Sequence, residues 1–377
     1  MRIFKALFCL AIVLWAVWSV PRLHPVAADA PTGRTFIYVN NNDFENSVSG
    51  FSVTSNGQLQ PLPGSPYSTG GLGSKVSAIG GLTVCKKARL LFATNNNDNT
   101  LTDFRINNDG SLSRLGVPIF TGGRFAAGVA CNKQGTKVFV ANIDADNIAA
   151  FNIDSNGIIS PTSDSPFPAG NGPIDLAINK AGTILFASHE FSHSIGVYQI
   201  DSSGGLRLIN DVTTLGLTNH GLTLNLNTSR LYVAELGNRS ISGFRVDLNN
   251  GNLALLPNTP YFTDGEQPIA VTTTPNGQFV YATNTNTSTI SIFASQPDGS
   301  LIAIPNSPFN TDGLGPAGMV VNKRGTLLFI ANGGFAGSKD VSVYHIAANG
   351  TLTSVPGSPF TTGSIGIPSA IGILETK

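Results

Sequence analysis

A short apolar segment that ends in a polar residue recurs seven times along the chain. Its copies are Phe36–Asn40, Leu91–Asn95, Val138–Asn142, Leu185–His189, Leu231–Glu235, Val280–Asn284 and Leu328–Asn332, with 46 to 55 residues between successive ends. Runs of this length rich in β-branched and aromatic residues predict strands, and the continuous apolar character predicts burial on both faces. The regular spacing indicates one structural unit repeated seven times.

Three further runs complete each unit. An alternating run follows each segment, and it ends at a turn glycine, at Gly57, Gly110, Gly157, Gly204, Gly251, Gly299 and Gly350. Asn-Gly and Asp-Gly pairs at most of these turns supply the positive φ angles that tight hairpins require. A third run then leads to a proline-aromatic pair such as Pro166-Phe167, and a fourth, such as Pro173–Ile178, precedes the next apolar segment.

Four short antiparallel strands in about 47 residues are typical of a propeller blade. We therefore predict an all-β fold, a seven-bladed β-propeller of four-stranded antiparallel blades forming one domain over residues 34–375. The first unit lacks the run before its apolar segment, and a spare run, Pro368–Leu374, follows the last unit. The C-terminal strand should complete the first blade and close the ring, so that no open sheet edge remains there.

The first residues read as a targeting sequence. Arg2 and Lys5 precede an apolar stretch, Ala6–Val20, and small residues follow it. This layout predicts a signal peptide over residues 1–28, cleaved after Ala28, and a secreted or periplasmic protein with no stable membrane span after cleavage. Cleavage after Ala30 is disfavoured because Pro31 would follow. The alternative is an uncleaved anchor, for which the stretch is short.

Composition and cysteine content limit the classes of function that the protein could have. Lys and Arg (22) balance Asp and Glu (22), so the chain lacks the basic surface of a nucleic-acid binder. Gly and Pro together make up about one residue in six, which suits many turns. Two cysteines follow the signal peptide, Cys85 and Cys131, and they either form a disulfide or are small buried residues. Their spacing carries no metal motif, and we expect no cofactor and a monomer.

The repeat resembles a known family. Tyr281–Asn284 is close to a Tyr-Val-Thr-Asn motif, Pro275–Gly277 precedes it, and Ser-Pro-Phe endings recur. These features resemble the YVTN-repeat propellers and the seven-bladed lactonase-like family, which includes propeller-type 6-phosphogluconolactonases. The resemblance covers roughly residues 34–375 and implies the propeller fold. It also implies an activity on lactones, although one fold hosts many functions.

Candidate site residues gather where the apolar segments end and the innermost strands begin. His189 and Glu235 end two segments, and His220 and Asp175 begin two innermost strands. His220 or Glu235 could be the base that activates water on a lactone carbonyl, with His189 assisting. Arg239 or Arg124 could stabilise the oxyanion. The alternatives are a metal held by both imidazoles and the carboxylate, or plain contacts at a polar rim.

Asparagine ends the other five segments. Its amide is expected mainly to hydrogen-bond the backbone of the adjacent turn, and Asn142 and Asn284 are kept as candidate ligand contacts. The lactonase-like family implies a histidine motif at one innermost strand, an arginine at the next and a glutamate at a segment end. Here Asn171–Ile174 and Asn219–His220 lack the first two, and only Glu235 fits.

Two functions follow from this pattern. The first is an exported propeller that binds a small molecule, a saccharide or a protein partner, with the catalytic motif of the family largely lost. The second is a hydrolase that opens a sugar lactone by water attack, with Glu235 and His220 at its centre.

Overall fold

The computed structural model describes residues 33–74, 81–334 and 338–376. The chain divides into two units, residues 1–32 and 33–377, and every described residue belongs to the second. The predicted signal peptide therefore lies outside the described residues. No helix in the described part of the chain has the length and hydrophobicity that a membrane crossing requires.

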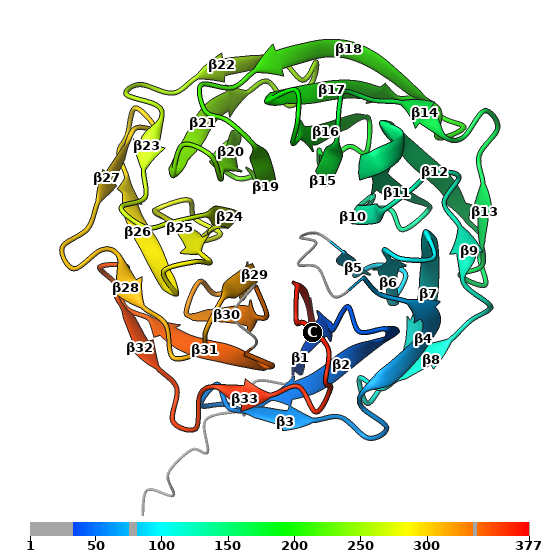
Figure 1. Ribbon diagram of the computed structural model, residues 1–377, viewed down its shortest axis with the longest axis horizontal. Helices are drawn as coiled ribbons and strands as arrows, with labels where there is room; N and C mark the ends of the chain where they lie inside the picture. The colour runs from blue at the N-terminus through cyan, green and yellow to red at the C-terminus, as the bar shows by residue number, and fades with distance from the viewer. Residues whose placement is uncertain (1–32, 75–80, 335–337, 377) are drawn as a thin grey trace, which may run out of the picture. The chain divides into compact units, whose positions relative to one another are not determined.

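Within the second unit, seven antiparallel sheets succeed one another around a common axis as the blades of a propeller (Figure 1). From the innermost strand outward, blade 1 comprises β34 (Ala370–Glu375), β1 (Thr35–Asn40), β2 (Glu45–Val53), β3 (Leu59–Pro61) and β4 (Tyr67–Leu72). Blade 2 comprises β5 (Leu82–Cys85), β6 (Leu90–Asn95), β7 (Thr100–Ile106), β8 (Leu112–Arg114) and β9 (Ile119–Phe120). Blade 3 comprises β10 (Ala126–Cys131), β11 (Lys137–Asn142), β12 (Asn147–Ile153), β13 (Ile159–Pro161) and β14 (Phe167–Pro168), with a 3-10 turn at Ile143–Ala145.

Blade 4 comprises β15 (Pro173–Ile178), β16 (Ile184–His189), β17 (Ser194–Ile200) and β18 (Leu206–Thr213). Blade 5 comprises β19 (Asn219–Asn225), β20 (Arg230–Glu235), β21 (Ser240–Val246), β22 (Leu253–Leu255) and β23 (Tyr261–Phe262). Blade 6 comprises β24 (Pro268–Thr273), β25 (Phe279–Asn284), β26 (Thr289–Ser295), β27 (Leu301–Ala303) and β28 (Phe309–Asn310). Blade 7 comprises β29 (Pro316–Val321), β30 (Leu327–Asn332), β31 (Asp340–Ile346), β32 (Leu352–Ser354) and β33 (Phe360–Thr361).

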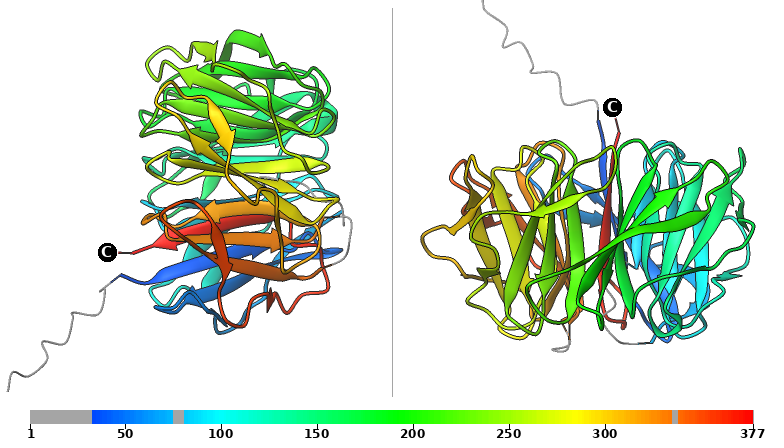
Figure 2. Two further views of the ribbon diagram at one scale, coloured as in Figure 1. Left: turned by 90° about the vertical axis from the view of Figure 1, so that its left-hand side faces the viewer. Right: turned by 90° about the horizontal axis from the view of Figure 1, so that it is seen from above.

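The predicted closure of the ring is confirmed. β34 pairs antiparallel with β1 over six residue pairs, from Thr35↔Glu375 to Asn40↔Ala370. Figure 2 shows the two strands side by side, the first strand of the chain in blue and the last in red. The C-terminal strand thus becomes the innermost strand of blade 1, and β1 has a hydrogen-bonded neighbour on each side.

The hydrophobic core lies between blades. Residues of β1 alternate, with Phe36 and Tyr38 packing against blade 2, and Ile37 and Val39 packing against blade 7. Because successive side chains of a strand point to opposite faces, a strand between two blades must be apolar at nearly every position. This is why the recurring segment is a continuous apolar run. The seven turn glycines after the third strands all have positive φ, between 80° and 98°.

One feature of the blades differs from the prediction. In six of them the fourth strand is broken into two pieces, which both pair with the same neighbour, as β3 and β4 do with β2. Proline lacks the N–H that a continuous ladder needs, and prolines lie in each of these breaks. Blade 4 has no proline from Leu206 to Thr213, and its outer strand β18 is continuous.

The structure also pairs the two cysteines. A disulfide joins Cys85 at the end of β5 to Cys131 at the end of β10, with 5.7 Å between the Cα atoms. The bond links the innermost strands of blades 2 and 3. The sequence left this pairing open, because spacing along the chain does not show which strand ends meet.

Candidate functional site

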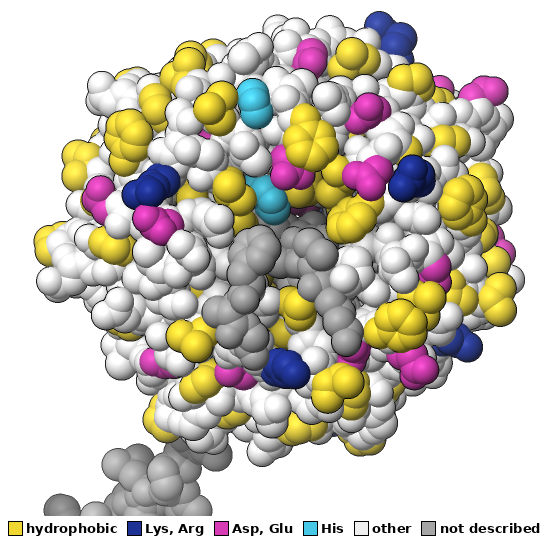
Figure 3. Space-filling view, in the orientation of Figure 1, with side chains coloured by type: hydrophobic (Ala, Val, Ile, Leu, Met, Phe, Trp, Pro, Cys, Tyr) yellow, Lys and Arg dark blue, Asp and Glu magenta, His cyan; other side chains and the backbone are white. Residues whose placement is uncertain are grey.

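The strands of the recurring segment end, and the innermost strands begin, on one face of the propeller, which we call the upper face. Figure 3 shows this face, with acidic, histidine and hydrophobic side chains beside the hollow at its centre. The sequence predicted that all the candidate residues lie on this face. The structure now shows which of them lie at the mouth and which lie inside a blade.

The asparagines that end the recurring segments lie inside the blades. The Asn284 amide donates to the hydroxyls of Thr289 (3.0 Å) and Ser291 (2.9 Å), on the adjacent strand β26. Asn142 donates to the Asn147 side chain at 2.7 Å and accepts from a threonine hydroxyl at the same distance. These amides are hydrogen-bonded, but most of their partners are side chains rather than the turn backbone that the sequence predicted.

Glu235 occupies the same position in blade 5 and has the same kind of partners. It is 0% exposed. Its carboxylate accepts from the Gly216 N–H at 2.9 Å, from the Ser240 hydroxyl at 2.6 Å and from the Ser242 hydroxyl. Ser240 and Ser242 follow it by five and seven residues, as Thr289 and Ser291 follow Asn284. Through these hydrogen bonds Glu235 links β20 to β21 and to the loop at Gly216. In other blades an asparagine side chain occupies this position.

His189 occupies this position in blade 4. It is fully buried, with Nδ1 3.0 Å from the Ser194 hydroxyl and 3.6 Å from an Asp211 carboxylate oxygen. Nε2 lies 3.3 Å from the Tyr198 hydroxyl and 3.3 Å from the Gly170 N–H. The hydrogen bond from His189 is the main cause that lowers the pKa of Asp211. Both ring nitrogens of His189 therefore have hydrogen-bond partners inside the protein.

A glycine in the loop before the innermost strand packs against the buried side chain that ends the recurring segment. This glycine was not identified from the sequence. A Cβ added to Gly216 would collide with the Glu235 carboxylate, and one added to Gly265 would collide with Asn284. Five of the seven blades carry the signal as Thr-x-Gly, at Thr69–Gly71, Thr121–Gly123, Thr214–Gly216, Thr263–Gly265 and Thr311–Gly313. The motif marks a loop that lies directly on the buried polar side chain.

We expect Glu235→Asn to keep nearly the wild-type free energy of unfolding, because asparagine makes the equivalent contacts in other blades. Glu235→Ala leaves the Gly216 N–H and two hydroxyls without their acceptor, and should cost about 2–4 kcal/mol. Urea denaturation measures both values. Glu266→Ala is the matched control, since its exposed ion pair with Arg239 is worth at most about 1 kcal/mol. Equal losses for Glu235→Asn and Glu235→Ala would contradict the structural role.

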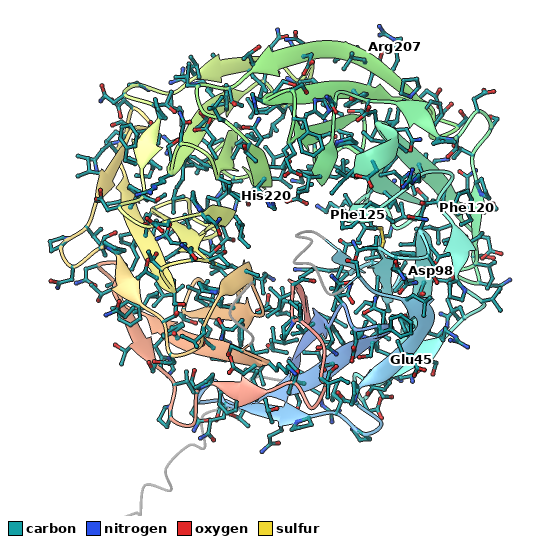
Figure 4. All side chains as sticks on the ribbon, in the orientation of Figure 1. Glu45, Asp98, Phe120, Phe125, Arg207 and His220 are labelled. Carbon is teal, nitrogen blue, oxygen red and sulfur yellow. A yellow bond between two sulfur atoms is a disulfide. The ribbon has the colours of Figure 1, made fainter. Side chains whose placement is uncertain are left out.

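His220 and Asp175 do lie at the mouth, on neighbouring innermost strands. His220 is 8% exposed, and its Nδ1 is buried with no hydrogen-bond partner among the described residues. Figure 4 labels it at the inner wall of the ring. Asp175 accepts from the Leu222 N–H at 3.0 Å, which joins β15 to β19. Burial lowers the pKa of His220 to about 4 and raises that of Asp175 to about 6.

These two shifts have opposite effects on stability. The unfolded state binds a proton at His220 more readily, so stability falls as pH drops from about 6.5 to 4. The folded state binds a proton at Asp175 more readily, so stability falls as pH rises from about 3.8 to 6. In the wild-type protein the two dependences largely offset each other over this range.

We therefore expect the single variants to diverge on acidification. Between pH 6.5 and 4, His220→Gln should gain roughly 3 kcal/mol of stability relative to wild type, because the lowered pKa of His220 no longer opposes folding on acidification. Asp175→Asn should instead lose stability relative to wild type over the same range. Urea denaturation at several pH values tests this, and parallel profiles for the three proteins would refute it.

The two candidate arginines lie on the rim. Arg239 is 62% exposed, and its guanidinium lies 2.9 Å from the Glu266 carboxylate, on the side of blade 6. Arg124 is exposed, and its carbonyl accepts from the Asp144 N–H at 3.2 Å. In the described part of the chain, no hydrogen bond or ion pair joins any two of His189, His220, Glu235 and Arg239.

The structure therefore separates residues that the sequence grouped. The side chains of His189 and Glu235 are buried inside their blades, and His220 lies at the mouth. Arg239 forms its ion pair with Glu266 on the exposed rim. Among the described residues, no three His, Cys, Asp or Glu side chains lie close enough together to hold a metal ion. The metal alternative considered from sequence has no ligand set there.

Other acidic and aromatic side chains lie in the upper loops of blades 3 and 4. Glu190 directly follows His189, and its N–H donates to the Gly172 carbonyl at 2.7 Å. Burial raises the pKa of the Glu190 carboxyl, and the negative charge of Asp144 raises it further. Phe191, 52% exposed, packs over Gly172, and Phe125 lies at the inner wall (Figure 4). For Glu190 and Phe191 the sequence signal was their position directly after the segment end at His189.

Comparisons with known proteins agree with this architecture. The family profile described as Lactonase, 7-bladed beta-propeller matches residues 28–166, 159–263 and 257–364. A crystal structure of a candidate 6-phosphogluconolactonase from Bacteroides uniformis has a TM-score of 0.75 at 18% identity, covering 91% of this chain and 99% of that one. The periplasmic gluconolactonase of Pseudomonas aeruginosa has a TM-score of 0.73 at 16% identity, covering 91% and 99%.

A functionally unknown protein from Desulfotomaculum acetoxidans is similar too, with a TM-score of 0.67 at 17% identity and coverage of 90% and 98%. No curated protein matches the sequence significantly. At these identities the solved structures establish the fold alone. The family profile, however, spans most of the chain, so the protein belongs to the family of seven-bladed β-propeller lactonases.

Proposed function

We propose that the protein is an exported propeller that binds a small ligand at the upper mouth and does not hydrolyse sugar lactones. The observation that carries this proposal is the environment of Glu235, the one residue that fits the catalytic pattern of the family. Its carboxylate is fully buried and accepts three hydrogen bonds from its own blade. A general base must reach water or substrate, and this carboxylate is occupied elsewhere.

The charges around the mouth argue against a phosphosugar. Asp144, Glu190 and Asp175 bring carboxylates to the side of blades 3 and 4. Phosphate recognition uses clustered arginine and lysine. Arg239 is engaged with Glu266 on the rim, away from this group. These three carboxylates outnumber Arg124, which lies beside Asp144, so an anionic substrate would meet more negative than positive charge there.

Export is supported by independent features. The N-terminal sequence has the layout of a signal peptide, and a disulfide joins Cys85 to Cys131. Disulfides persist in oxidising compartments, which include the periplasm and the extracellular space. The similar protein from Pseudomonas aeruginosa is described as periplasmic.

The proposal is tested by lactone turnover. The purified protein is incubated with gluconolactone, 6-phosphogluconolactone and a panel of other lactones, and ring opening is compared with the spontaneous rate in buffer. We expect no acceleration. Acceleration above the spontaneous rate that is lost in a folded Glu235→Asn or His220→Ala variant would refute the proposal.

Lactone hydrolysis centred on His220 is the second candidate, and one observation favours it. His220 lies at the mouth with an imidazole that is neutral at pH 7 and has an unpartnered nitrogen, which could take a proton from water. On this reading His220→Ala would abolish turnover and Glu235→Asn would not. The pair of variants therefore separates the two catalytic assignments.

A further inference from the structure

The mouth between blades 3 and 5 combines negative charge with apolar surface. Glu190 and Asp144 lie near enough for the charge of Asp144 to raise the pKa of Glu190. No lysine or arginine forms an ion pair with either of them in the described part of the chain, where the printed ion pairs involve other carboxylates. Neither carboxylate is in an ion pair among the described residues, and Glu190 is partly buried; exposed Arg124 lies beside Asp144, where its carbonyl accepts from the Asp144 N–H.

The loops that carry these side chains are fixed by backbone contacts. The Gly172 carbonyl accepts from the Glu190 N–H, and the Gly172 N–H donates to the Asp146 carboxylate at 2.8 Å. Asp146 follows the 3-10 turn that contains Asp144. These bonds link the upper loops of blades 3 and 4. The spacing of the two carboxylates is therefore set by the fold rather than by mobile side chains alone.

His220 provides an independent indication of a ligand. Its ring is 8% exposed at the inner wall, and Nδ1 has no hydrogen-bond partner. The Ser188 hydroxyl, two residues before Glu190, donates to the His220 carbonyl at 2.6 Å, so the histidine adjoins the strand that leads to Glu190. Nδ1 of a neutral imidazole either donates or accepts a hydrogen bond, and a buried unpaired polar atom favours a partner that satisfies it.

We propose that the upper mouth binds a small organic ammonium compound, with its charge between Glu190 and Asp144 and its carbon skeleton against Phe125 and Phe191. This rests on the proposed binding function and names the chemical class of the ligand. Carboxylates stabilise the positive charge, and aromatic faces attract a cation directly. The exposed Phe191 ring, packed over Gly172, supplies such a face beside Glu190.

Calorimetric titration of the purified protein with matched probes tests the proposal. Glucosamine and glucose share a ring and differ in one ammonium group, choline is a quaternary cation, and gluconate is an anion. We expect glucosamine or choline to bind at least about tenfold more tightly than glucose or gluconate. Binding should weaken as pH falls, because protonation of Glu190 removes its charge.

Substitutions test which carboxylates bind the ammonium group. Glu190→Gln and Asp144→Asn keep size and shape, and each should weaken ammonium binding about tenfold or more. Glu266→Gln is the control, since its carboxylate lies on the same face but is paired with Arg239. Absence of binding by both ammonium compounds, equal binding of glucose and glucosamine, or unchanged affinity in Glu190→Gln overturns the proposal. Lactone turnover is measured in a separate assay. The proposal that the protein does not hydrolyse lactones and the proposal that it binds an ammonium compound can therefore be refuted independently.

Discussion

Deletion of β34, from Ala370 onward, is expected to abolish cooperative folding at 25 °C. The deletion removes six residue pairs from β1 and exposes a row of unpaired backbone groups on that strand. It also removes Leu374 and Ile373 from the cores between blades 1 and 2 and between blades 7 and 1. Each of these side chains contributes about 1.5–3 kcal/mol, against a typical total of about 5–15 kcal/mol. Circular dichroism during urea denaturation measures the loss.

A milder variant separates closure from the cost of truncation. Leu374→Ala should lower the free energy of unfolding by about 2–4 kcal/mol, because its side chain is buried at 3% exposure. Ile365→Ala lies in the loop just before β34, where the side chain is 74% exposed, and should change stability by no more than about 0.5 kcal/mol. A deleted chain that unfolds at the wild-type urea midpoint would show that ring closure is dispensable.

The fold could be predicted because its determinants are local and repeated. A strand between two blades must be apolar on both faces, and a hairpin turn must accept positive φ, so both leave marks in every unit. The run Pro368–Leu374 was assigned to blade 1 because that unit lacked a strand, and the pairing of Ile373 with Ile37 agrees. The break of the outer strands was missed, although the prolines that cause it were visible in the sequence.

The site could be predicted only in part, because a strand end does not fix the direction of its side chain. Glu235 and His189 end their strands at the upper face, yet both are fully buried and bonded within a blade. The clue was the serine five residues later, at Ser240 and Ser194, which is a threonine after Asn284. His220 lies at the inner wall of the ring, because the innermost strands line the axis. Its unpaired nitrogen depends on packing that no sequence pattern reveals.

Replacing both cysteines, Cys85→Ala with Cys131→Ala, is expected to lower the free energy of unfolding by about 4 kcal/mol. The two residues are 46 apart in sequence, and closing a loop of that size reduces the entropy of the unfolded chain by about this amount. The bond also anchors β5, an innermost strand of only four residues, to β10 of the next blade. Guanidinium denaturation of the oxidised wild type and the double variant measures the difference.

Reductant provides the control for the same bond. Dithiothreitol should shift the unfolding midpoint of the wild-type protein toward that of the double variant and leave the variant unchanged. Because Cys85 is buried at 3% exposure, reduction should be slow in the native state and fast once the protein unfolds. If the oxidised wild type and the double variant unfold at the same denaturant concentration, the bond does not hold blades 2 and 3 together. The ring would then depend on inter-blade packing and hydrogen bonds, as it does between the other blades of the described chain.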